Sequence, residues 1–182
     1  MKRNWLIKHT LTGVLLAVWS IGVQAAPITE HRYNYNTESS IRDIMAAMAE
    51  LPAEVLWDPG NGEWTDEGYP DIPDDESNWA KLRNNAVILR EVGNAINLPG
   101  RVADHILPDE NVEGVLAPAE IEELIRTRYA QWSAFSQSLE GLANQFIEAI
   151  DSRDKQRVIE LGDEMNNICT ACHTAFWYPQ QQ

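Results

Sequence analysis

The sequence predicts an all-α fold, an antiparallel four-helix bundle. Apolar residues recur at helical spacing in four long segments, and no segment of useful length alternates apolar and polar residues as a strand does. Loops rich in glycine and proline separate the segments. Because each amphipathic helix must bury its apolar stripe, four helices of ~20 residues or more form a bundle.

The first expected helix runs from about Ser39 to Trp57, with an apolar stripe of Ile41, Ile44, Met45, Met48, Leu51, Pro52 and Val55. The second runs from about Ser77 to Leu98, and Pro99-Gly100 stops it. Its apolar face consists of Trp79, Leu82, Ala86, Leu89 and Ile96.

The third expected helix begins near Pro118, since proline suits a first helical turn. Its stripe is Ile121, Leu124, Ile125, Trp132, Phe135, Leu139, Leu142, Phe146 and Ile150. The fourth follows the cap signal Asp151-Ser152 and ends at Pro179. Its stripe is Val158, Leu161, Met165, Ile168, Cys169, Cys172 and Phe176. Residues 151–154 connect these two helices closely, whereas residues 58–76 and 99–117 form long loops.

The first 25 residues have the pattern of a cleaved export signal. Three basic residues precede the apolar run Leu11–Val18, and Val23-Gln24-Ala25 fits a small-residue cleavage site before Ala26. The apolar run is short for a membrane span, which needs about 20 residues. We expect cleavage of residues 1–25, a single mature domain at residues 26–182, and no membrane span in it.

The only cysteines of the chain stand in the pentapeptide Cys169-Thr170-Ala171-Cys172-His173, within the fourth expected helix. C-x-x-C-H is the attachment motif of a c-type haem. The two thiols bond the vinyl groups of the haem, and the histidine gives an imidazole nitrogen to the iron. On a helix, Cys169, Cys172 and His173 share one face. The motif therefore predicts one covalent haem c, with His173 as an iron ligand.

Other uses of the two cysteines fit less well. A thioredoxin-like pair needs a strand-to-helix context, and a structural zinc site usually needs four ligands. A disulfide between such close positions in a helix closes a very short loop and stabilises little. Export agrees with haem attachment, because c-type haem is fitted outside the cytoplasm.

Charge limits the choice of partner. Without residues 1–25 the chain has 11 basic and 28 acidic residues, a net charge of −17. Nucleic acid and anionic membrane surfaces are poor partners, because binding them needs a basic surface. A basic redox partner would be steered toward this chain, and the same charge serves solubility.

A single C-x-x-C-H near the C-terminus of a four-helix chain resembles the class II c-type cytochromes, the cytochrome c-prime family, over nearly the whole mature chain. Further stretches resemble a low-spin, methionine-ligated periplasmic branch of that family. They are Ile41-Arg42-Asp43-Ile44-Met45, Pro52-Ala53 with Trp57, Trp79 with Leu-Pro-Gly-Arg at 98–101, and the continuation of the motif as Phe176-Trp177-Tyr178-Pro179.

The resemblance implies haem on Cys169 and Cys172, His173 as the proximal ligand, and a residue of the first helix on the other side of the iron. Family members often have a basic residue four positions after this histidine, near the haem propionates, where this chain has Trp177. The propionates then need another cation. Arginine binds carboxylates in a bidentate manner, and the two candidates are Arg42 and Arg101. Members often dimerise through the first two helices, so a homodimer is also expected.

The sixth iron ligand is sought among the methionines of the mature chain, because a thioether is a soft ligand that raises the haem potential. Met165 lies on the haem-bearing helix and is interpreted as core. Met45 matches the family position on the first helix and is the expected ligand, with Met48 as the fallback. His31 and His105 could also ligate, but both stand in polar, irregular sequence.

We therefore expect a periplasmic electron-transfer protein whose iron is ligated by His173 and Met45, and no enzymatic activity. No arrangement of Ser/His/Asp, Cys/His or paired carboxylates supports catalysis, and no glycine-rich phosphate loop is present. Two alternatives stay open. One is a five-coordinate cytochrome c-prime that binds NO or CO at an open iron site. The other is a haem subunit or electron donor of a periplasmic oxidoreductase.

Overall fold

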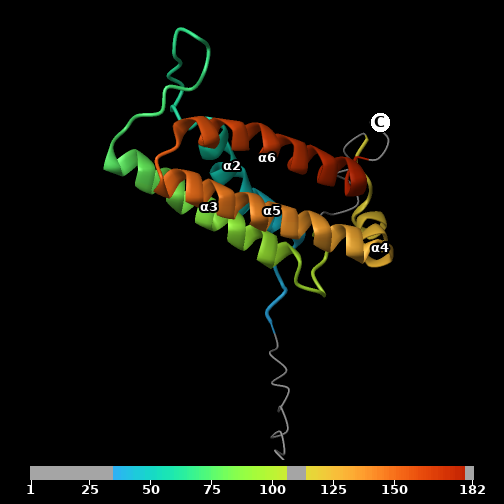
Figure 1. The fold of residues 1–182 in the computed structure, drawn as a ribbon. Helices are drawn as coiled ribbons and strands as arrows, with labels where there is room; N and C mark the ends of the chain where they lie inside the picture. Colours follow the sequence, from blue (N-terminus) through green and yellow to red (C-terminus); the bar gives the residue numbers. More distant parts are fainter. Residues whose placement is uncertain (1–34, 106–113, 179–182) are drawn as a thin grey trace, which may run out of the picture. The chain divides into compact units, whose positions relative to one another are not determined.

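Helices make up most of residues 35–105 and 114–178, the part of the chain that the computed structural model describes (Figure 1). No β-strand occurs in these two ranges, where the extended pairing is an isolated bridge between Trp64 and Pro70. The predicted all-α class is confirmed for the described residues. The predicted signal peptide at residues 1–25, its cleavage site and Pro179 lie outside them.

The first predicted helix is present and has three sections: α1 (Ile41–Ile44), the π-helical η1 (Met45–Ala49) and α2 (Glu50–Trp57). A capping box begins it. Ser40 Oγ accepts the N–H of Asp43 at 3.0 Å, and the Asp43 carboxylate accepts the N–H of Ser40 at 2.8 Å. The Ser40 side chain thus fixes where the chain enters the helix.

The π-helical section interrupts the α pattern just before a proline. Pro52 has no N–H to donate to the carbonyl of Met48, and the N–H of Glu50 bonds to the carbonyl of Met45, five residues back. The turn therefore holds one residue more than an α turn. Such π turns often occur at functional sites, and this one begins at Met45.

The second predicted helix is α3 (Glu76–Ile96), whose ends agree with the prediction to within two residues. Asp75 caps it, because its Oδ1 accepts the N–H groups of Ser77 and Asn78, both at 3.0 Å. The predicted loop before this helix is anchored by the amide of Asn78, which donates to the carbonyls of Pro59 and Pro73 at 3.5 and 3.3 Å.

The prediction of one long third helix is wrong. The segment divides into α4 (Pro118–Thr127) and α5 (Tyr129–Asp151), because Arg128 leaves the helical conformation, with φ −118° and ψ 34°. The bend allows α4 to pack against both α5 and α6 and leaves Ile121 only 2% exposed. We infer that the free energy gained by burying the Ile121 side chain exceeds the free energy lost where the helix is interrupted.

The fourth predicted helix is α6 (Lys155–Phe176), but the predicted cap at Asp151-Ser152 is wrong. Asp151 is the last residue of α5, and Arg153 turns the chain with a φ of 55°. The cap is Asp154, whose carboxylate accepts the N–H of Arg157 at 3.0 Å. The short connection between the two helices is as predicted.

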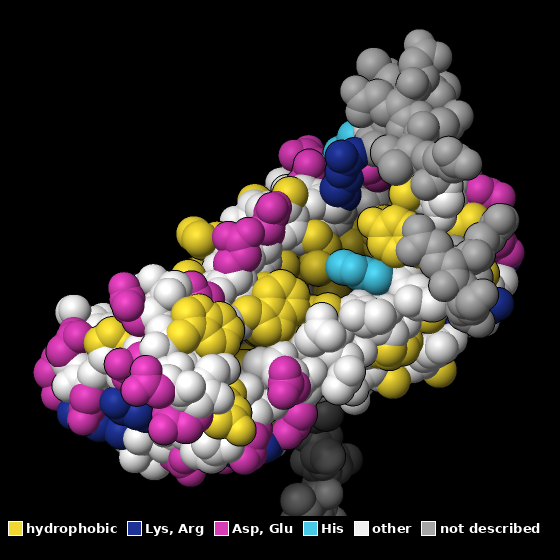
Figure 2. Space-filling view, turned by 90° about the horizontal axis from the view of Figure 1, so that it is seen from above, with side chains coloured by type: hydrophobic (Ala, Val, Ile, Leu, Met, Phe, Trp, Pro, Cys, Tyr) yellow, Lys and Arg dark blue, Asp and Glu magenta, His cyan; other side chains and the backbone are white. Residues whose placement is uncertain are grey.

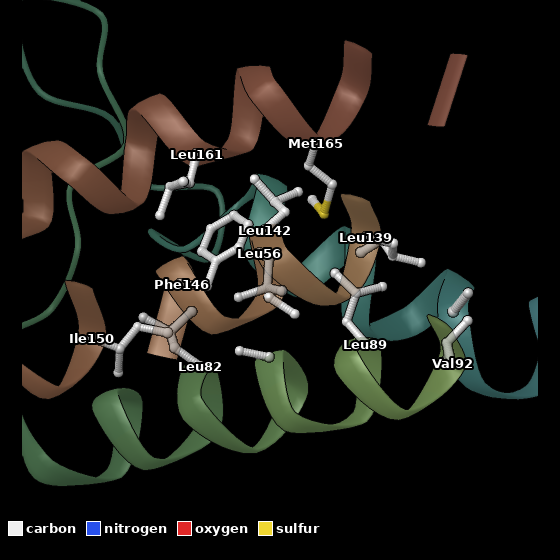
Figure 3. Close-up of a cluster of buried hydrophobic side chains, with 14 of the residues drawn as sticks. Leu56, Leu82, Leu89, Val92, Leu139, Leu142, Phe146, Ile150, Leu161 and Met165 are labelled. Carbon is white, nitrogen blue, oxygen red and sulfur yellow. The ribbon is translucent and has the colours of Figure 1, made fainter. Parts of the chain in front are cut away.

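Helices α2, α3, α5 and α6 bury their apolar stripes in one core. α3 packs against α5, α5 packs against α6, and α2 packs against both α3 and α6. Figure 3 shows side chains from all four helices pointing into the same space. Each such aliphatic or aromatic side chain contributes about 1.5–3 kcal/mol when it is fully buried. Those at most 1% exposed include Leu56, Leu82, Leu89, Val92, Phe146, Leu161 and Met165.

The backbones of α3 and α5 approach each other closely at Gly93. A Cβ atom at this position would lie 2.8 Å from the carbonyl oxygen of Ser136 and 2.7 Å from Cγ of Glu140. Only glycine leaves enough room for the two backbones at this crossing. Since Trp132 and Phe135 stand on the same stretch of α5, this contact also fixes the part of α5 that reaches the site described below.

None of the helices formed by the described residues is both long enough and apolar enough to span a lipid bilayer.

Candidate haem site

The C-x-x-C-H residues lie near the C-terminal end of α6, on one face of that helix. The thiols of Cys169 and Cys172 are not joined in a disulfide, and both side chains are half-buried. His173 is half-buried beside them. The structure therefore brings the three predicted attachment residues together, as their spacing requires.

A cavity of about 300 Å³ adjoins this face of α6. Most of its lining is hydrophobic, and Figure 2 shows a hollow with hydrophobic side chains in it and a histidine at its edge. The end of α6 and the two residues after it contribute Ile168, Cys169, Cys172, His173, Trp177 and Tyr178, and α5 contributes Trp132, Phe135 and Leu139. The rest of the lining is Ile41, Arg42, Met45, Ile96, Asp104 and Val115.

The three predicted methionines occupy different places. Met45 is half-buried and lines the cavity. Met48 is also half-buried, but it packs against the core and does not line the cavity. Met165 is fully buried among core side chains (Figure 3). Of the three, only Met45 shares the cavity with His173, from a different helix.

The two predicted arginines also differ. Arg42 lines the cavity, and its Nη1 lies 2.9 Å from Oδ2 of Asp104, which lines the cavity as well. Arg101 does not reach the cavity. Its Nε donates to the carbonyl of Ala95 and its Nη1 to the carbonyl of Ser39, both at 2.8 Å. Arg101 thus connects the end of α3 to the residues before α1, and the structure does not bring it to the predicted propionate site.

The two histidines considered as alternative ligands are not at the cavity in the described chain. His105 does not line it, and its Nε2 lies 2.9 Å from the carbonyl oxygen of Glu38, to which it donates. His31 lies outside the described residues. Trp177, which replaces the basic residue of the family pattern, forms part of the cavity wall.

Burial sets the protonation of the attachment residues. It raises the pKa of the Cys169 thiol, and it raises the pKa of the Cys172 thiol to about 12, with a smaller contribution from Cys169. Both groups are therefore neutral thiols at pH 7. Burial lowers the pKa of His173. Its imidazole is then neutral at pH 7, which is the form that binds a metal.

Aromatic side chains surround His173. The ring of Trp177 lies 6.5 Å from the imidazole and the ring of Tyr178 lies 6.2 Å from it, both between centroids. Behind them, Trp132 contacts Phe176 edge to face at 5.2 Å. Trp132 Nε1 donates to the carbonyl of Ile96 at 3.2 Å, so this buried indole is satisfied and fixed. These rings cover part of the imidazole, and His173 stays half-buried.

The residues present fit a covalently attached haem. Two free thiols and a neutral imidazole face one apolar cavity, a thioether stands in the same cavity on another helix, and an arginine lies at its wall. The volume is at the low end of the ~300–1,000 Å³ usual for small-molecule sites. Within residues 35–105 and 114–178, no group of three or more His, Cys, Asp or Glu residues is arranged to hold a bare metal ion.

Sequence reasoning missed three residues of the cavity wall. Asp104 and Val115 come from the loop that was predicted between the second and third helices, and nothing in a loop sequence indicates which side chains turn inward. Tyr178 was part of the family pattern only. Phe135 and Trp132 were placed correctly on an apolar stripe, but a stripe does not show which of its residues face a cavity.

Comparisons of this chain with protein-family models, with curated proteins and with solved structures found no match.

Proposed function

We propose that this protein is a periplasmic electron carrier of the cytochrome c-prime type, an antiparallel four-helix bundle with one haem c bound on α6. The observation that carries the proposal is that Cys169, Cys172 and His173 line one apolar cavity together with Met45. This combination supplies two points of covalent attachment and two iron ligands. The helix contacts described above are those that such a bundle requires.

Each residue has a role that follows from its chemistry. The S–H bonds of Cys169 and Cys172 would add across the two vinyl groups, sulfur to one carbon and hydrogen to the other, so that both sulfurs become thioethers. His173 would give a neutral imidazole nitrogen to the iron, and Met45 would give its sulfur. Arg42 stands where it can neutralise a propionate. The bound haem supplies a one-electron Fe(III)/Fe(II) couple.

The ligands and the apolar cavity wall determine whether the proposed haem transfers electrons or binds small molecules. With His173 and Met45 both bound, the iron would have no free coordination position for water, a gas or a substrate. Trp132, Phe135 and Trp177 line the cavity with apolar rings, which lower the local dielectric constant. Thioether ligation favours Fe(II) and raises the potential. A site of this kind exchanges electrons and performs no reaction on a substrate.

Place and partners are proposed from the sequence. Export of the chain rests on the pattern of residues 1–25, which the structure does not describe. The acidic composition favours a basic redox protein as the partner, in preference to nucleic acid or an anionic membrane surface. An oxidoreductase that receives electrons from this protein would need a basic docking surface for the same reason. A homodimer through the first two helices is proposed from the family resemblance alone.

The first experiment asks whether haem is attached. Protein purified from a host that matures c-type cytochromes is extracted with acidic acetone, and its intact mass is measured. We expect the colour to stay with the polypeptide and the mass to equal residues 26–182 plus one haem. Colour that extracts completely would refute covalent attachment.

The second experiment separates electron transfer from gas binding. Visible spectra are recorded for the oxidised and reduced protein, with and without carbon monoxide. Low-spin spectra that carbon monoxide hardly changes support ligation by His173 and Met45. A high-spin wild-type protein that binds carbon monoxide quickly would favour the five-coordinate alternative.

A further inference from the structure

The polar part of the cavity wall is an ion pair. Arg42, on the first turn of α1, and Asp104, in the loop after α3, both line the cavity, with Nη1 and Oδ2 2.9 Å apart. The Arg42 side chain is 53% exposed, whereas the Asp104 side chain is only 13% exposed. The acidic partner is therefore the one that is held away from solvent, beside a mostly apolar cavity.

Asp104 is held firmly. Its Oδ1 accepts the N–H of His105 at 2.7 Å, so both of its oxygens have a donor. The segment just before Asp104 is hydrogen-bonded to α1, because the N–H groups of Ile41 and Arg42 donate to the carbonyls of Val102 and Ala103 at 2.9 and 3.1 Å. Neither the carboxylate nor the segment behind it can swing out without breaking these bonds.

Two other carboxylates, those of Asp43 and Glu122, bind neighbouring parts of the chain. The Asp43 carboxylate is bound to the Ser40 N–H, and it lies 3.9 Å from Nε2 of His105. Glu122 of α4 accepts the N–H of Ala103 at 3.0 Å. Neither carboxylate lines the cavity. Asp104 is therefore the one acidic side chain in the described lining.

We propose that Asp104 sets the reduction potential of the haem, resting on the function proposed above. Its carboxylate holds Arg42 at the cavity wall and places a fixed negative charge against the cavity. A negative charge favours Fe(III), the more positive oxidation state, and the effect is large where solvent screening is weak. Asp104 is thus a positioning residue whose charge partly offsets that of Arg42, and the pair determines the field at the iron.

The test is the midpoint potential of the purified haem protein, titrated spectroscopically. Asp104→Asn keeps the size of the side chain and removes its charge, so it should raise the potential. We expect about a tenfold shift of the reduction equilibrium, which is about 59 mV for a one-electron couple. Arg42→Gln should lower the potential, and the double variant should return toward the wild type. Asp104→Glu, which keeps the charge, should stay close to the wild type.

A matched control is available at the other end of the α3–α5 pair. Asp151 pairs with Arg83, Oδ1 to Nε, at 2.8 Å, with about half of each side chain exposed, and neither lines the haem cavity. Asp151→Asn should leave the potential unchanged. A potential for Asp104→Asn equal to that of the wild type, with an unchanged low-spin spectrum, would overturn this proposal and leave the proposed function intact. Wild-type protein without bound haem would overturn both.

Discussion

Two methionines of the first helix stand three positions apart and have different surroundings. Both side chains pack against the hydrophobic core, but only Met45 also lines the cavity that contains His173. A thioether serves either as core filler or as a soft metal ligand. The neighbours of each side chain, and not its residue type, decide between these two roles.

Met45→Ala should therefore open the iron site. Loss of the sulfur leaves the iron five-coordinate, so the spectrum should become high-spin and carbon monoxide should bind rapidly. The midpoint potential should also fall, because a ligand that favours Fe(II) is gone. Visible spectroscopy of the oxidised and reduced variant, with and without carbon monoxide, measures all of these changes.

Met48→Ala is the control for that variant. It should lower stability by less than the 2–5 kcal/mol typical of a fully buried methionine, because Met48 is only half-buried. Its spectrum should stay low-spin. A high-spin Met48→Ala beside a low-spin Met45→Ala would show that the ligand has been misassigned by one turn.

The proximity of residues on one helix could be predicted from their spacing in the sequence. Cys169, Cys172 and His173 were found because their positions along one helix already fix their relative geometry. Arg101 could not be judged in this way. Its guanidinium binds the carbonyls of Ala95 and Ser39, and the second of these is distant in sequence. Asp104 was missed for the same reason, since only the fold places it beside Arg42.

Among the helices, the contact of α3 with α5 depends on one glycine. A side chain at Gly93 would meet the carbonyl oxygen of Ser136, which is backbone and cannot move alone. Gly141 of α5 is a natural comparison, because no atom lies within 4 Å of the position a Cβ would take. The two glycines occur in helices of similar length and differ in their surroundings.

Gly93→Ala should destabilise the protein and Gly141→Ala should not. Overpacking at the α3–α5 crossing costs about 1–3 kcal/mol. In an open helical position, alanine is favoured over glycine by about 0.5–1 kcal/mol, so Gly141→Ala should be slightly stabilising. Urea unfolding of both haem proteins, followed by circular dichroism, gives the two free energies. If Gly93→Ala has the same free energy of unfolding as the wild type, the helices lie farther apart at this crossing than the structure indicates.

Helix positions were predictable from periodicity, but helix interruptions were not. No proline or glycine marks the break at Arg128, which results from the packing of α4 on α5 and α6. The cap at Asp154 was displaced from the predicted pair because α5 continues to Asp151 before the chain turns. At Arg128 tertiary packing accompanies the break, whereas at Asp154 one local cap signal replaces another.

At the scale of the whole molecule, the cavity is continuous with the core. Ile41, Ile96, Trp132 and Leu139 belong both to the buried cluster and to the cavity lining. A cofactor that fills the cavity would therefore complete the core, and its absence would leave apolar side chains without neighbours.

Cys169→Ala combined with Cys172→Ala should give a loosened or rapidly degraded apoprotein. Thermal unfolding followed by circular dichroism should show a lower midpoint and a broader transition than for the haem protein. Free haem added to the variant provides the control, since binding through His173 should restore part of the stability. An apoprotein as stable as the haem form would show that the fold does not depend on its cofactor.

The net charge has a kinetic consequence. Acidic side chains gather on the surface at the end where the loop between α2 and α3 lies (Figure 2), and seven exposed acidic residues belong to positions 63–76 of that loop and helix start. Electrons should pass more slowly to a basic redox protein as salt increases, because the Debye length is only about 10 Å at 0.1 M. Stopped-flow rates measured against ionic strength test this, with an uncharged small-molecule oxidant as the control. If the rates with the basic protein do not change with salt, the acidic surface serves solubility and does not attract the partner.

The π turn at Met45–Ala49 affects how this chain is compared with others. The turn holds one residue more than an α turn. A related protein with a regular α-helix here would therefore have one residue fewer between the two buried positions that correspond to Ile44 and Ala53. A correct alignment with such a protein has a one-residue gap inside this turn. An alignment without the gap is shifted by one position either before or after the turn. In the first case the capping box and Met45 are matched with the wrong residues, and in the second case the buried Pro52 and Leu56 are.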